Sequence, residues 1–240
     1  MKQAEQEVTL IDSMGTDLSV VNAARVSFHK ESTLEHKEDT VPFGHAFIKK
    51  EGDWLIRLKE NDAKLINYLA KHKHWTPFAH SFLSFRIKAP IFVARQLVKH
   101  QVGLAWNEVS RRYVDEEPEF WFPKEWRGRP VNMKQGSNGV LEDEQPTMHI
   151  SMFVQHQTNH ALLSYKELLE AGVAPEQARM VLPQNTMTEW IWSGSLAAFA
   201  RVCKLRLDPH AQLETQEVAQ KIRDLTEPLF PVSFKALMEN

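Results

Sequence analysis

A single run of strict alternation constrains the fold of this chain more than any other feature. From Ser81 to Lys88 apolar and polar residues alternate, so that Leu83, Phe85 and Ile87 share one face, as in a strand with one buried side. Most of the remaining chain is patterned for helices, and no β-α-β rhythm repeats along it. The sequence therefore predicts an α+β fold in which helices dominate.

The other predicted elements follow from apolar spacing, caps and breakers. In the first half of the chain, helices are expected over residues 17–25, from a cap at Asn61 or Asp62 to the region before Pro77, and from Ile91 to about Gln101 with Gly103 as its stop. In the second half, a long helix is expected from Thr147 to Ala171 with Gly172 as its stop, and a short one from Pro175. Two more are expected from a Ser195 cap to about Lys204 and from an Asp208 cap to about Glu227, the latter being the final helix. A strand is expected around Trp190 and Trp192, and loops at 106–113 and 123–146. The polar stretch up to about residue 53 is expected to be a surface excursion, and the 123–146 loop either a lid or an insertion.

Composition limits the classes of function. With 240 residues and no internal boundary in the sequence, we expect one catalytic domain over residues 1–240. The formal charge of -2 gives no global reason to bind a polynucleotide, so any anion site must be local. Only Cys203 is present, which excludes an intrachain disulfide and fits a reducing compartment. No stretch approaches the roughly 20 apolar residues of a membrane helix, and no apolar signal core begins the chain. A cytoplasmic protein without a membrane partner is expected.

Polar side chains suited to an anionic, planar ligand are concentrated between Arg95 and Tyr113. Groups that can meet phosphate oxygens are Arg95, Lys99, His100, Arg111 and Arg112, and groups that can read a base or sugar are Gln96, Asn107, Glu108 and Ser110. In the predicted helix, Arg95 and Lys99, like Gln96 and His100, are four residues apart and lie on neighbouring strips of one face. A helix end and the following loop together predict the ligand site.

Six motifs, spread in order over nearly the whole chain, resemble those of the flavin-dependent thymidylate synthases. They are A-A-R-V-S-F at 23–28, H-W-T-P-F-A-H at 74–80, P-I-F-V-A-R-Q at 90–96, N-E-V-S-R-R-Y at 107–113, A-R-M-V-L-P at 178–183 and L-R-L-D-P-H-A-Q at 205–212. The resemblance implies a helix-rich single domain around an antiparallel sheet. It also implies a homotetramer with active sites between subunits.

The central signature of the chain differs from the family pattern of Arg-His-Arg, seven residues and Ser. The matching triplet here is Lys99-His100-Gln101, and eight residues, 102–109, precede Ser110. Lysine keeps the charge of arginine without its bidentate fork, and Gln101 keeps donors without charge. The contacts of this triplet with the flavin and the nucleotide phosphate are therefore where this chain departs most from the family.

The resemblance also assigns ligands to residues. It implies that dUMP is bound by Gln96, Lys99, Glu108, Val109, Ser110, Arg111, Arg112 and Arg179. It implies that FAD is bound by Thr76, Lys99, His100, Gln101, Glu108, Ser195, Leu196, Ala197 and Arg201, where the family often has Asn and Arg at the positions of Ser195 and Ala197. His74 is expected to line or support the flavin site.

The reaction that the resemblance implies is the methylation of dUMP to dTMP. Methylenetetrahydrofolate would donate the carbon and NADPH would reduce FAD, since no side chain can donate a hydride. Arg206 matches the family residue that activates N3 of the base, because a guanidinium there favours the ionised base and raises electron density at C5. Ser110 would then be a ligand and not a nucleophile, and Cys203 a small core residue.

Other interpretations remain open on the sequence alone. A relative that adds a hydroxymethyl group without the final reduction is one alternative, and an inactive nucleotide- or nucleic-acid-binding homologue is another; both are suggested by the altered triplet. His149, His156 and His160 are spaced like metal ligands on a helix, but they lack an H-E-x-x-H pattern, so no metal site is expected. Trp106, Trp121 and Trp126 are interpreted as core or subunit-contact residues and not as base-stacking ones.

Overall fold

A four-stranded antiparallel sheet forms the centre of the molecule. The computed structural model describes residues 1–38, 47–51, 54–114, 116–130, 136–141 and 144–240. The sheet has the order β2 (Glu7–Met14), β6 (Phe82–Pro90), β9 (Met187–Ser195), β7 (Leu104–Glu108), and all three pairings are antiparallel. The α+β class predicted from the sequence is confirmed, as are the strands at 81–88 and around Trp190.

The alternation in β6 creates the core. Leu83, Phe85 and Ile87 are buried, whereas the residues between them are exposed or half-buried. Phe85 lies opposite Trp192 of β9, and both rings meet the edge of Phe199, at centroid distances of 5.0 and 5.3 Å. One face of the sheet thus supplies the apolar side chains on which the helices pack.

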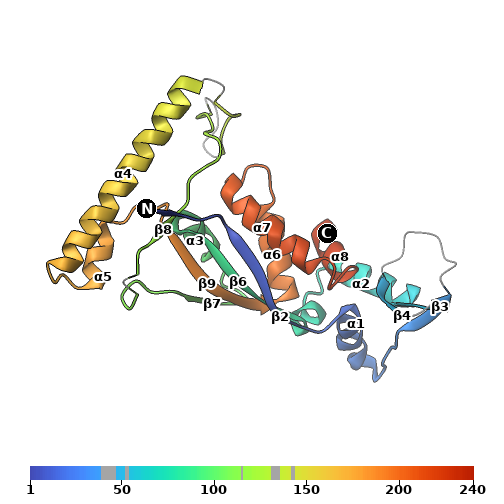
Figure 1. The fold of residues 1–240 in the computed structure, drawn as a ribbon. Coiled ribbons are helices and arrows are strands. Elements are labelled where there is room, and N and C mark those ends of the chain that lie inside the picture. The colour runs from blue at the N-terminus through green and yellow to red at the C-terminus, as the bar shows by residue number, and fades with distance from the viewer. Residues whose placement is uncertain (39–46, 52–53, 115, 131–135, 142–143) are drawn as a thin grey trace.

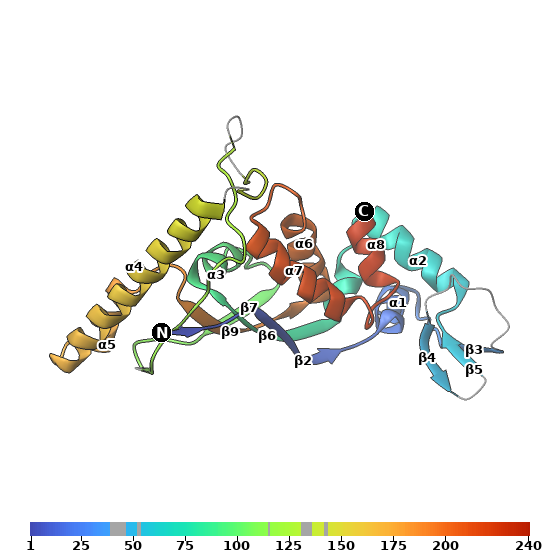
Figure 2. The same ribbon diagram turned by 45° about the horizontal axis from the view of Figure 1, so that its top comes forward.

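Three helices cover this face. They are α3 (Ile91–Leu97), α6 (Leu196–Arg206) and α7 (Leu213–Thr226), which lie on the same side of the sheet in both views (Figures 1 and 2). Ser195 caps α6 as predicted, because its Oγ accepts a hydrogen bond from Ala198 N at 3.3 Å. The cap fixes where β9 ends and α6 begins.

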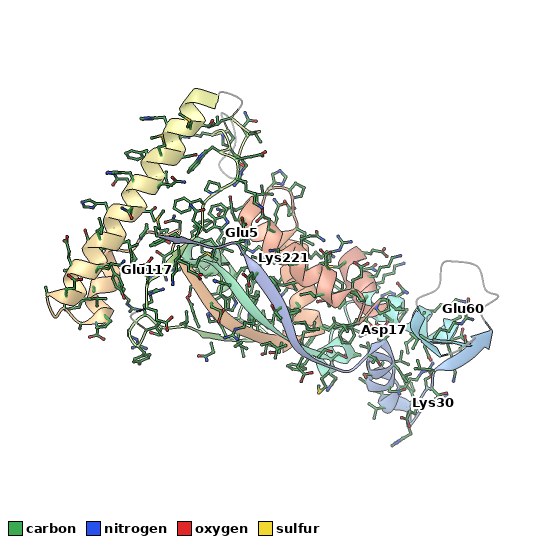
Figure 3. All side chains as sticks on the ribbon, in the orientation of Figure 1. Glu5, Asp17, Lys30, Glu60, Glu117 and Lys221 are labelled. Atoms are coloured by element: carbon green, nitrogen blue, oxygen red, sulfur yellow. The ribbon has the colours of Figure 1, made fainter. Side chains whose placement is uncertain are left out.

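A second group of helices extends the core at one end of the sheet. It consists of α1 (Asp17–Arg25), α2 (Glu60–Lys71), α8 (Ser233–Glu239) and the 3₁₀ helices η1 (Val26–Phe28) and η2 (Thr76–His80). Asp17, labelled in Figure 3, accepts hydrogen bonds from Val232 N at 2.9 Å and Ser233 N at 2.8 Å, so the start of α1 holds the start of α8. Burial raises the pKa of this carboxyl group against the opposing effect of these bonds.

Two parts project from opposite ends of the molecule. At one end stand α4 (Glu144–Glu170), α5 (Pro175–Ala178) and the 3₁₀ helix η3 (Arg179–Val181), and at the other lies a small sheet of β3 (Glu35–Glu38), β5 (Trp54–Arg57) and β4 (Phe47–Glu51) (Figures 1 and 2). A short parallel pair, β1 (Lys2–Gln3) and β8 (Glu119–Phe120), lies near α4. Glu117, which is labelled in Figure 3 and precedes β8, forms an ion pair with Lys166 of α4, with 2.7 Å between Oε2 and Nζ.

Several predicted boundaries were wrong. Lys59 is the N-cap of α2, so neither Asn61 nor Asp62 caps that helix; the buried Asp62 carboxylate instead accepts hydrogen bonds from Arg25 and Ser32. Helix α7 begins at Leu213 and not after Asp208, and α8 follows it. The stretch expected as a surface excursion contains β3 and β4, and residues 39–46 and 52–53 lie outside the described residues.

The two corrections that matter most concern the segment after β6. Helix α3 ends at Leu97, about one turn earlier than expected, so Lys99, His100 and Gln101 lie beyond it. The start of the predicted 106–113 loop, Trp106 to Glu108, belongs to β7, which pairs with β9 from Leu104 opposite Gly194 to Glu108 opposite Trp190. Gly103 lies in the turn directly before β7 and not at the end of a helix, and its φ of 77° is one that glycine adopts readily.

None of the described helices combines the length and apolar character that a membrane crossing requires. In the loop predicted at 123–146, Arg127 and Val140 form an antiparallel bridge, while residues 131–135 and 142–143 lie outside the described part.

Candidate functional site

Arg206 lies at the centre of a polar cluster between α6 and the end of α3. Its Nε donates a hydrogen bond to His100 Nε2 at 2.9 Å, and its NH2 group donates to the backbone oxygen of Gln96 at 3.3 Å. Arg206 is the last residue of α6, and His100 follows α3 directly, so both helix ends aim polar groups at the same place. Three residues that the sequence singled out are therefore adjacent.

The charge state of this cluster follows from its burial. His100 is half-buried, and its pKa is lowered to about 4, first by burial and then by the positive charges of Arg206 and Arg201. Its ring is therefore neutral at pH 7. Burial also lowers the pKa of Arg206, although a guanidinium stays protonated throughout the physiological range. The cluster carries a positive charge that is partly withdrawn from water.

The amide of Gln96 is oriented by Gln212, the N-cap of α7, and by Thr215 in the first turn of that helix. Its Nε2 donates to Gln212 Oε1, and its Oε1 accepts from Thr215 Oγ1 at 3.3 Å. The sequence did not identify Thr215, although Gln212 closes the motif at 205–212. Only a contact between segments more than a hundred residues apart shows that these two side chains support Gln96.

A cavity of about 480 Å³ lies beside the start of α6. Four of its lining residues come from the region that was expected to hold FAD or to support it, namely His74, Ser195, Ala197 and Arg201, and others are Lys73, Trp75, Val102, Gly103 and Leu237. Arg201 donates to the backbone oxygen of Val102. Thr76 starts η2 directly after Trp75, whereas the side chain of Leu196 is buried in the core. The lining combines apolar walls with cationic groups, which fits part of a planar cofactor with phosphates.

Glu108 is held at the end of β7 by two donors. Thr188 Oγ1 donates to Glu108 Oε1 at 2.7 Å, and Trp106 Nε1 donates to Glu108 Oε2 at 3.1 Å. Trp106 itself stacks on Trp190, with ring centroids 4.3 Å apart. Trp106 thus packs as predicted for a core residue, and it also fixes a carboxylate, a role that the sequence did not reveal.

The residues after β7 form an exposed turn. Val109 N donates to Glu189 O at 2.8 Å, which holds the turn at the sheet. Ser110 Oγ accepts from both the backbone N and Nε of Arg112, at 3.3 and 3.2 Å. Arg111 donates to the backbone oxygen of Glu116 at 2.8 Å. These bonds leave much of both guanidinium groups available to a ligand.

One chain does not bring all the predicted residues together. Among the described residues, no hydrogen bond or ion pair joins Arg206 or His100 to the 108–112 segment or to Arg179. Arg179 starts η3, and its Nε donates a hydrogen bond to the backbone oxygen of Glu176 at 3.2 Å. The neighbouring α5 lies at one end of the molecule, whereas α6 lies near its middle in both views (Figures 1 and 2). The side chains of Lys99 and Gln101 are exposed.

Cys203 is fully buried in α6, and burial raises the pKa of its thiol to about 12. A thiol in this state is neither ionised nor accessible. The prediction that it is a core residue is confirmed. Within the described part of the chain, no three His, Cys, Asp or Glu side chains are grouped as metal ligands.

Comparisons with known proteins agree with one another. Residues 9–232 match the family model described as thymidylate synthase complementing protein. A protein named flavin-dependent thymidylate synthase from Thermosipho africanus is 36% identical over 230 residues, which cover 96% of this chain and 90% of the relative. One with the same name from Thermus thermophilus is 37% identical over 233 residues, covering 97% of this chain and 76% of the relative.

The comparison with solved structures agrees with these sequence matches. The UMP/dUMP methylase PolB from Streptomyces cacaoi, bound with 5-Br dUMP, superposes with a TM-score of 0.78 at 26% identity and covers 100% of this chain and 97% of its own. The same enzyme bound with 5-Br UMP gives a TM-score of 0.79.

Proposed function

This chain belongs to the thymidylate synthase complementing protein family, and we propose that it is a flavin-dependent thymidylate synthase. The proposed reaction converts dUMP to dTMP, with methylenetetrahydrofolate as the carbon donor, NADPH as the reductant and FAD as the cofactor. The observation that carries the proposal is Arg206, a partly buried guanidinium fixed by His100 and Gln96, in a chain whose only thiol is buried and protonated. Relatives at 36 and 37% identity that bear this name support it.

Arg206 would activate the uracil ring electrostatically, in place of the covalent addition of a cysteine to that ring. Attack by C5 of uracil on a one-carbon donor requires electron density at C5, and ionisation of N3 provides it. A guanidinium next to N3 stabilises the ionised base, and partial withdrawal from water strengthens that effect. Because Arg206 keeps its proton throughout the reaction, its role is electrostatic and not that of a general base.

The nucleotide would be held by residues around this cluster and by the turn after β7. The proposed dUMP ligands are Gln96, Lys99, Glu108, Val109, Ser110, Arg111, Arg112 and Arg179. Ser110 acts as a ligand because its Oγ already accepts two hydrogen bonds from Arg112, a cation and not a base. Glu108 is pre-oriented by Thr188 and Trp106, so its carboxylate would meet a ligand without rearranging.

The cavity beside α6 is the proposed binding place for part of FAD. Ser195, Ala197 and Arg201 line it, Thr76 adjoins it, and Lys99, His100, Gln101, Glu108 and Leu196 complete the proposed set. When bound, the flavin supplies the hydride that no side chain can donate. Arg201 and Lys99 are the cations that would meet its phosphates.

We further propose that complete sites form between the subunits of a homotetramer. Arg206 and Arg179 lie in separate parts of one chain, so one dUMP would need both from different copies. Exposed apolar side chains support such contacts: on α4, Met148, Met152 and Phe153 are 66, 61 and 58% exposed. The single, buried thiol of Cys203 supports a reducing, cytoplasmic location.

The test combines spectroscopy with product analysis. The purified protein is first examined for flavin absorbance. It is then supplied with methylenetetrahydrofolate, NADPH and either dUMP or UMP, and the mass of the nucleotide product is measured. UMP is included because PolB is a UMP/dUMP methylase. We expect a methylated product from dUMP. Arg206→Ala should lower kcat by about 10² or more, while Arg223→Ala, which removes an exposed cation paired with Glu227, should not. A hydroxymethylated product, or full turnover by Arg206→Ala, would contradict the proposal.

A further inference from the structure

The hydrogen bond between Arg206 and His100 determines which nitrogen of the imidazole carries the proton. Because Arg206 Nε is a donor, His100 Nε2 must accept, and an imidazole nitrogen accepts only when it carries no proton. The proton of the neutral ring is therefore on Nδ1. The low pKa of His100 agrees with this geometry, since the cations Arg206 and Arg201 face the ring. His100 is therefore neutral: its Nε2 accepts a hydrogen bond, and its Nδ1–H is a donor.

The hydrogen bonds of Arg206 leave part of its guanidinium free. Of its five N–H groups, the Nε one is taken by His100 and one on NH2 by the backbone of Gln96. Both N–H groups on NH1 and one on NH2 have no partner among the described residues. Two anchors on a planar fork set both its position and its plane, so the free N–H groups point in a fixed direction.

We infer that His100 is the positioning residue for Arg206: as the Nδ1–H tautomer it anchors the Nε edge of the guanidinium, so that the free N–H edge meets the base. This inference rests on the proposed role of Arg206 toward N3. It assigns His100 a role distinct from cofactor contact alone. With Nε2 occupied, the polar group that its ring can offer a cofactor is the Nδ1–H donor, which suits a carbonyl or phosphate oxygen.

Two substitutions of similar polarity separate this role from a general one. In His100→Gln the amide oxygen reaches the position of Nε2 and can still accept from Arg206. In His100→Asn the oxygen reaches only the position of Nδ1, so the anchor is lost. The exposed His156 of α4 offers a control, His156→Gln.

The readout is ionisation of a bound nucleotide, which needs no turnover. 5-Fluoro-dUMP is bound to the flavin-loaded protein, and its N3 ionisation is followed across pH by ultraviolet absorbance and ¹⁹F NMR. We expect wild type and His156→Gln to lower the N3 pKa relative to free ligand. His100→Gln should keep most of that shift, and His100→Asn should lose about tenfold in the ionisation constant, one pKa unit, with flavin still bound.

The outcomes distinguish this inference from the function on which it rests. If wild type leaves the N3 pKa of the bound nucleotide unchanged, the proposed activation by Arg206 fails. If wild type lowers it and His100→Asn lowers it as much as His100→Gln does, the activation stands and the positioning role of His100 is overturned.

Discussion

At the scale of single residues, burial decides which groups can take part in chemistry. Cys203 and His100 are both titratable, yet the thiol is sealed in the core while the imidazole lies at the edge of a cluster. The sequence was sufficient to predict that Cys203 is inert, because it lies in an apolar helical run. It could not predict that His100 accepts from Arg206, because that contact joins residues 106 positions apart.

Replacing Cys203 tests this distinction. We expect Cys203→Ala to leave the turnover of dUMP within about twofold of wild type, since the thiol touches no ligand, and to lower the free energy of unfolding by about 1 kcal/mol through lost packing. In the native protein at pH 8, a thiol-specific reagent should not react, because the pKa is about 12 and the sulfur is buried. Unfolding in denaturant should expose it. Rapid native labelling with loss of dUMP binding would contradict this.

At the scale of elements, periodic segments were predictable and their junctions were not. The alternation in β6 and the cap of α6 are local features, and both were predicted. Strand β7 was missed because its short run, Leu104 to Glu108, is defined by pairing with β9, whose residues lie about ninety positions later. The same pairing explains why α3 ends early, since the chain must turn at Gly103 to enter β7.

Gly194 shows how closely these elements approach. A Cβ atom at this position would lie 2.4 Å from the backbone oxygen of Gly103 and 2.5 Å from Leu104 Cδ2. We therefore expect Gly194→Ala to separate β9 from β7 and lower the free energy of unfolding by about 1–3 kcal/mol, measured by denaturant titration. Flavin affinity should fall too, because Gly103 and Ser195 line the adjoining cavity.

The control for this substitution is Gly139→Ala, where an added Cβ meets no atom within 4 Å. Gly139→Ala should leave the free energy of unfolding and the flavin affinity nearly unchanged. Equal effects of the two substitutions would show that the approach of β7 to Gly194 does not limit stability.

At the scale of the whole molecule, the fold class followed from pattern but the arrangement of the site did not. The absence of a β-α-β rhythm predicted an α+β protein correctly. Nothing in a linear sequence shows that α5, which directly precedes Arg179, lies at one end of the molecule, while α6, which ends at Arg206, lies near its middle (Figure 1). Motifs that the resemblance assigns to one site therefore lie in two separate parts of the chain. The proposed homotetramer would cover the exposed apolar side chains of α4.

Mixing two inactive variants tests whether these surfaces meet across subunits. Arg206→Ala and Arg179→Ala each remove one half of the proposed site, so each pure protein should lose most turnover. In randomly mixed oligomers, a site that takes its halves from two different chains has both intact in about a quarter of cases. We therefore expect equal mixtures, unfolded and refolded together or co-expressed, to recover about a quarter of wild-type activity. Mixing Arg206→Ala with Arg206→Lys gives the control, because no mixed site then regains Arg206. If both halves came from one chain, no mixture would recover activity, and the proposal of sites between subunits would be wrong.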